Sequence, residues 1–215
     1  MNTFLLSRTI AYNLCDDMQL HSEITKWCSL KLPLKIQMPI VAKPSEIPAQ
    51  SAIAKRLTGA YFHDAWSVIA AEPDLSALGQ FLRAASATPS WVNALMNVRN
   101  RAVATVGLKN LGGLNHLNAA KPEADYKPGD RIGIFTLIEK TPDEVLFGDN
   151  DKHLNVVLSV HRAVSVTTGE TTITLTTVVH IHNLLGRLYM LPVTPMHKMI
   201  VPSVLKSVGC ARDAT

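Results

Sequence analysis

Histidines gather near the end of this 215-residue chain. His180 and His182 are two residues apart in a segment rich in β-branched residues, so they share one face if that segment is a strand. His161 belongs to the preceding segment, and three histidines from adjacent strands can ligate zinc. No Asp, Glu or Cys falls inside residues 171–183 to add a ligand. We therefore expect solvated or hydrogen-bonded histidines and no bound metal.

A second polar cluster is the run Asp149-Asn150-Asp151-Lys152-His153. Asp151 and His153 offer a carboxylate and an imidazole for general acid–base catalysis, and His161 offers a second imidazole. The same run is typical of a hairpin loop held by Asx turns. We favour the loop, placed at the rim of a cavity, and retain Asp151, His153 and His161 as candidate catalytic residues.

Large apolar and aromatic side chains suggest a different function, the binding of a small molecule. Methionine adapts to varied ligand shapes, and an arginine can orient an acidic group of a ligand. An ordinary filled core would use the same apolar residues, so the sequence allows both interpretations. The candidate ligand-binding residues are Trp66, Trp91, Arg187, Tyr189, Met196 and Met199.

Composition excludes several classes of protein. Hydrophobic residues make up 47% of the chain and charged residues 18%, which is enough apolar material for a core. The net charge of +4 is spread out, and no basic stripe with interleaved aromatics indicates nucleic-acid binding. No apolar run is long enough to span a membrane. The motifs of common hydrolases, kinases and zinc proteases are missing, and no cofactor is expected.

Three cysteines, Cys15, Cys28 and Cys210, are too few and too irregularly spaced for a disulfide framework or a zinc ribbon. We expect reduced thiols and a cytoplasmic location.

The first 37 residues differ from the rest of the chain. Met38 begins a stretch that resembles an ordinary protein start, so residues 1–37 are interpreted as an extension of uncertain order. A short helix packed on the domain is the alternative. A single domain over residues 38–209 and a tail over residues 210–215 complete the predicted organisation.

Two helices are expected after a first strand. The aromatic and apolar run 61–71 predicts that strand. Asp74 is the expected cap of a helix with apolar residues at helical spacing. Thr88 is the expected cap of a second helix, which ends at Gly107 and is followed by a loop.

Four strands follow in sequence order and predict an antiparallel meander. In the last of them, alternation places Ile173 and Leu175 on a core face and Thr174, Thr176 and Val178 on a half-solvated face. The four predicted strands are residues 131–140, 144–149, 153–164 and 171–183.

The chain ends in helical sequence. Asn183 is expected to cap a segment that runs to Leu191, and Thr194 to cap the next segment, which runs to Gly209. Prolines within this stretch should break or kink it. The complete order predicts an α+β fold in which one curved antiparallel sheet wraps on a long C-terminal helix.

This order resembles the helix-grip fold of the START/polyketide-cyclase-like (SRPBCC) superfamily. The chain is also similar to a bacterial family of unknown function, the one numbered 2867. The likeness covers residues 60–207 and is strongest where His182-Asn183 is followed by Gly186-Arg187, with Pro195 and His197 after them. Other runs that carry it are WVNALMNVRNRA, PGDRIGIFT, DNDKHLNVVLSVHRA and PMHKMIVPSVLKS.

The resemblance implies the fold and three possible functions. The first is a binding module with an apolar pocket between the sheet and the C-terminal helix, for a small apolar or amphipathic molecule. The second is a cyclase- or dehydratase-type enzyme of the same fold, and the third is an interaction subunit without a cavity. The resemblance also implies a reductase domain as a possible partner.

Overall fold

The computed structural model describes residues 37–38, 40–104, 121–209 and 212–213. The chain divides into a larger unit, Met38–Arg212, and a smaller unit made of Met1–Gln37 and Asp213–Thr215. Strands β1 (Gln37–Met38) and β9 (Arg212–Asp213) form a two-stranded sheet. All three cysteines lie outside the described residues, so the reduced state of their thiols stays a prediction.

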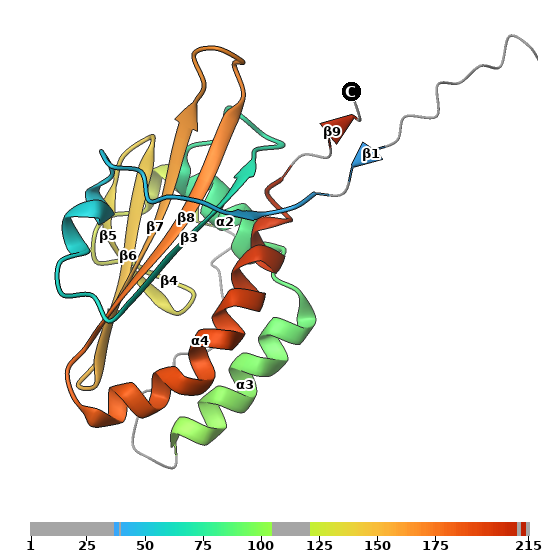
Figure 1. Ribbon diagram of the computed structural model, residues 1–215. Helices are drawn as coiled ribbons and strands as arrows, with labels where there is room; N and C mark the ends of the chain where they lie inside the picture. The colour runs from blue at the N-terminus through green and yellow to red at the C-terminus, as the bar shows by residue number, and fades with distance from the viewer. Residues whose placement is uncertain (1–36, 39, 105–120, 210–211, 214–215) are drawn as a thin grey trace, which may run out of the picture. The chain divides into compact units, whose positions relative to one another are not determined.

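The larger unit is built on one curved antiparallel sheet of seven strands (Figure 1). Its strand order is β2-β3-β8-β7-β6-β5-β4, so the predicted meander is confirmed and its last strand also pairs with the first long strand, β3. The strands are β2 (Lys43–Pro44), β3 (Phe62–Ile69), β4 (Arg131–Ile132), β5 (Phe135–Lys140), β6 (Glu144–Asn150), β7 (Leu154–Val164) and β8 (Thr171–Ile181).

The predicted single strand over residues 131–140 is two strands, β4 and β5, joined by a tight turn. Gly133 has a φ of 59° there, a conformation that glycine adopts without the steric cost of a Cβ. The chain reverses at this residue, and Ile132 pairs with Phe135.

Helical segments lie before β3, between β3 and β4, and after β8. They are η1 (Ala52–Arg56), α2 (Ala77–Ser86), α3 (Ser90–Ala104), η2 (Glu123–Asp125) and α4 (Leu184–Leu205). No helix in the described ranges is long and apolar enough to cross a bilayer.

Both predicted caps of the first two helices are wrong. Ser76 caps α2, because its hydroxyl accepts a hydrogen bond from the Gly79 N–H at 3.1 Å, whereas Asp74 lies two residues earlier and is exposed. The Thr88 hydroxyl donates backward to the Ala85 carbonyl at 2.8 Å and so closes α2 instead of opening α3. The expected helix end at Gly107 lies outside the described residues.

The final helix is capped as predicted but does not break. The side chain of Asn183 accepts from the Gly186 N–H at 3.1 Å, and α4 then continues without interruption. The predicted restart at Thr194 is therefore wrong. Pro192 and Pro195 lie inside the helix, and the helix axis bends in Figure 1. A bend is expected, because each proline removes one backbone hydrogen-bond donor and its ring crowds the preceding turn.

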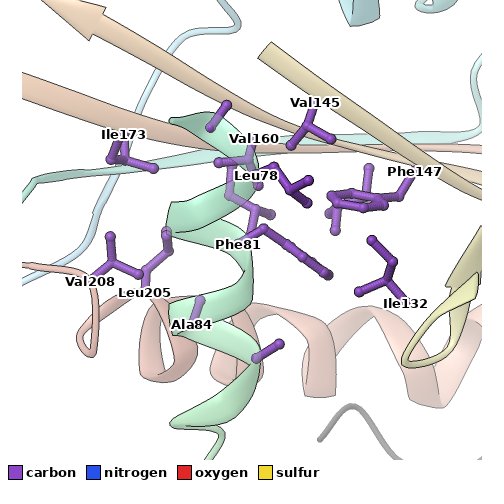
Figure 2. Close-up of a cluster of buried hydrophobic side chains, with 14 of the residues drawn as sticks. Leu78, Phe81, Ala84, Ile132, Val145, Phe147, Val160, Ile173, Leu205 and Val208 are labelled. Carbon is purple, nitrogen blue, oxygen red and sulfur yellow. The ribbon is translucent and has the colours of Figure 1, made fainter. Parts of the chain in front are cut away.

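The main core fills the space between α2, the inner face of the sheet and the end of α4. Figure 2 shows Leu78 and Phe81 of α2 against Val145 and Phe147 of β6, and the Phe81 and Phe147 ring centroids are 4.0 Å apart. Leu205 of α4 joins the same cluster, so the last helix packs on the sheet as predicted.

A second core lies on the opposite face of the sheet, which the sequence pattern described as half-solvated. That prediction is wrong for Thr174, Thr176 and Val178, which are buried. Ile53 of η1 packs there against Leu146, Val157 and Val178, and all four are buried. The segment before β3 therefore covers the outer face, and β8 is buried on both sides.

Candidate functional site

A cavity of about 260 Å³ lies between the inner face of the sheet and helices α2, α3 and α4. This volume is slightly below the range of about 300–1,000 Å³ that is typical of ligand pockets. Most of its lining is apolar. The apolar lining includes Phe81, Leu95, Leu158, Leu175, Met190, Val193 and Val201.

The floor of the cavity follows from strand alternation. Leu158 and Val160 of β7 point inward, and so do Leu175, Thr177 and Val179 of β8. All five are buried. The two central strands thus present mid-sized side chains to the cavity, while the large rings of the main core lie beside α2.

The roof is one face of α4. Its lining residues recur at intervals of three and four, which is the period of a helix. Tyr189 and Met196, both predicted to bind a ligand, are among them. The roof residues are Tyr189, Met190, Val193, Met196, His197, Ile200, Val201, Val204 and Leu205.

Helix α3 contributes a side wall of the cavity and an arginine. Arg99 lines the cavity, donates from Nε to the Tyr189 hydroxyl at 3.1 Å, and lies over the Tyr189 ring at 5.6 Å from its centroid. The guanidinium also donates to the Asn100 side chain at 2.9 Å. These contacts hold α3 beside α4 and fix Arg99 at the cavity wall.

Three residues of the polar run at 149–153 lie at the cavity. Asp149, Asp151 and His153 all line the cavity. The ring of His153 lies against the side-chain amide of Asn183, with 3.1 and 3.3 Å between Nδ1 and the two amide heavy atoms. The side chain of His153 thus contacts an amide and not a carboxylate. This contact fixes the His153 ring as a polar group at the rim.

The rim loop is tied to the start of α4. The Asn183 side chain donates to the Lys152 carbonyl at 3.1 Å, and the His182 N–H donates to the His153 carbonyl at 2.9 Å. Gly186 is required at this junction, because a Cβ there would lie 2.3 Å from the His153 carbonyl oxygen. This explains why His182, Asn183 and Gly186 occur together in the sequence.

A contact between a histidine and an aspartate at the cavity was not predicted. His197 lines the cavity, and its Nε2 lies 3.1 Å from Oδ1 of Asp64 on β3. The indole N–H of Trp66 donates to the other Asp64 oxygen at 3.0 Å, and Phe62 meets the His197 ring edge-on. The side chains of His197 and Asp64 are largely buried, with 20% and 15% of their area exposed. Asp64 is therefore held on both oxygens.

Other predicted site residues lie away from the cavity. The side chains of Trp91 and Met199 are 41% and 56% exposed, and neither lines the cavity. Arg187 is exposed as well, and Trp66 packs against the main core. Arg99 on α3 and His197 on α4, which were not predicted, line the cavity instead.

The histidines of the proposed metal set are separate. His180 points to the outer face as alternation predicted, and its Nε2 lies 2.9 Å from the Arg56 carbonyl oxygen. His161 faces the outer side of the sheet opposite Glu144, with Nδ1 buried and unpartnered. Across the described ranges, no group of three or more His, Cys, Asp or Glu side chains is arranged to hold a metal ion.

The family of the chain follows from a comparison with protein-family models. Residues 56–204 match the model described as "Protein of unknown function (DUF2867)". The chain belongs to this family. The match spans β3 through nearly all of α4, and of the residues that line the cavity only Leu205 and Val208 lie beyond it. No curated protein and no solved structure matches the chain.

Proposed function

We propose that this protein binds a small, largely apolar molecule in the cavity between the sheet and α4. The observation that carries the proposal is the cavity of about 260 Å³, with an apolar lining and polar groups gathered at its rim. Apolar walls with a few placed polar groups are the usual composition of small-molecule sites. The existence of the cavity also argues against an interaction subunit with a filled interior.

The size of the cavity limits the ligand and its affinity. A molecule of one or two rings would lose roughly 200–300 Å² of apolar surface to the cavity, worth about 5–8 kcal/mol at about 25 cal/mol per Å². Association costs several kcal/mol of that gain, so a micromolar Kd is expected.

An acidic group on the ligand would be oriented by Arg99. This arginine lines the cavity and is held against Tyr189, whereas Arg187, the arginine that the sequence suggested, is exposed on α4. A guanidinium binds a carboxylate or phosphate through paired hydrogen bonds.

The test is a thermal-shift and fluorescence screen of small aromatic and aliphatic acids, repeated with a variant whose cavity is filled. Ala84 is buried in the cavity wall, so Ala84→Leu should weaken any hit on the order of ten-fold or more by occupying its space. Ala94→Leu, on the exposed side of α3, is the matched control and should bind as the parent does. If no compound binds better than millimolar, the proposal is wrong.

A second candidate is an enzyme of the same fold, and one observation favours it. His197 faces the cavity and is oriented by the doubly held Asp64, an arrangement that suits a general base. Compounds recovered from the screen distinguish the two functions. Unchanged compounds support binding alone, and a converted compound whose conversion is lost in His197→Gln supports the enzyme.

A further inference from the structure

Helix α4 has a second apolar face, which points away from the cavity. Leu184, Leu188, Leu191 and Met199 are 79%, 62%, 67% and 56% exposed. Their spacing of four, three and eight residues places them on one side of the helix. The opposite side carries the buried Met190 and the cavity roof.

The exposed face of α4 carries only positive charge. Arg187 and Lys198 fall within the same arc of the helix, and both are exposed. The whole of α4 contains no Asp or Glu, and neither does α3, the helix that Arg99 holds beside it. Helix α3 adds the exposed Val98, at 64%.

Exposed apolar stripes of this length mark an interaction surface. The leucines can enter the acyl boundary of an anionic bilayer, and the long cationic side chains beside them can reach its phosphate groups. A symmetric contact between two copies is disfavoured, because it would bring Arg187 and Lys198 of both copies together without a carboxylate on either helix.

We infer that the face of α4 formed by Leu184, Arg187, Leu188, Leu191, Lys198 and Met199 docks on an anionic membrane surface. The helix lies along the interface and does not cross it. The inference is independent of the proposed ligand, because it uses the side of α4 that faces away from the cavity.

The experiment is co-sedimentation of the full chain with phosphatidylcholine vesicles, with and without phosphatidylglycerol. Binding is expected only to the anionic vesicles and should weaken at high salt. Arg187→Gln and Lys198→Gln should each weaken binding roughly five-fold, which is the effect of about one unit charge near such a surface. Leu188→Gln with Leu191→Gln should weaken it on the order of ten-fold or more.

Val166→Gln is the matched control, because this valine is the most exposed large apolar residue in the described ranges and lies on the β7–β8 hairpin. It should bind as the parent does, and unchanged melting temperatures for all variants show that they fold. Equal binding to neutral and anionic vesicles, no binding at all, or loss of binding in Val166→Gln would overturn the inference. A dimer in ultracentrifugation that Leu188→Gln dissociates would also overturn it, by making the face a contact between copies.

Discussion

Glu144 is the side chain that fastens the segment before β3 to the outer face of the sheet. Its carboxylate accepts from the N–H groups of Ala52 and Ile53 at 2.7 and 3.3 Å and from the Ser159 hydroxyl at 2.7 Å. The three donors come from η1 and from β7. One charged acceptor on β6 therefore joins β7 to a segment that lies about ninety residues before Glu144 in the chain.

Glu144→Gln should lower the free energy of unfolding by about 2 kcal/mol, because the amide keeps the shape but replaces one acceptor oxygen with a donor that faces other donors. Urea denaturation measures the change. Glu139→Gln, an exposed glutamate on β5, is the matched control and should change the free energy by less than about 0.5 kcal/mol. Equal effects of the two substitutions would show that the three hydrogen bonds do not stabilise the fold.

At the scale of elements, η1 covers the second core on the outer face of the sheet. Ile53 is fully buried against Leu146, Val157 and Val178, although η1 is only five residues long. A short helix of this kind has little stability of its own, so its position depends on the residues it buries.

Ile53→Ala should cost about 3 kcal/mol, the usual loss for a large-to-small change in a well-packed core. Leu184→Ala, at a site that is 79% exposed on α4, should cost less than about 0.5 kcal/mol. Chemical denaturation of both variants gives the comparison. A loss at Ile53 as small as that at Leu184 would mean that the outer cluster adds nothing to stability.

Local sequence signals predicted the elements well and their surroundings poorly. Asn183 predicted the start of α4, and the β-branched run predicted β8, because capping and strand preference depend on residues close by in the sequence. Thr174 and Thr176 could not reveal their burial, since threonine suits a solvated strand as well as a covered one. Only the packing of Ile53 from a distant segment makes that face a core.

In the candidate site, too, local sequence predicted some residues and missed those that depend on contacts between distant segments. Tyr189 and Met196 were predicted from helical sequence and line the cavity, and their part in ligand binding stays a prediction. The pairing of Asp64 with His197 joins residues 133 positions apart, so no local pattern indicates it. Arg99 was missed because nothing in its own helix distinguishes it from Arg101. Its contact with Tyr189 depends on how α3 and α4 lie together.

At the scale of the whole chain, the larger unit contains the sheet, both cores and the cavity. The interpretation of residues 1–37 as an extension is still a prediction. A chain that begins at Met38 should have a melting temperature within about 2 °C of the full chain, a difference that corresponds to about 0.5–1 kcal/mol at this size. Calorimetry of both chains measures it. A drop of more than about 5 °C would mean that the first 37 residues help to hold the domain together.

The burial of β8 on both faces has a consequence for how the sequence can vary. Most strands of an antiparallel sheet have one side on which polar substitutions are neutral. From Ile173 to Val179 every side chain of β8 is buried, and its neighbours β3 and β7 leave it no free edge. Substitutions accumulated by descendants of this chain should therefore be sparse along this run. They should be frequent a few residues earlier in the sequence, at the exposed hairpin tip around Val166.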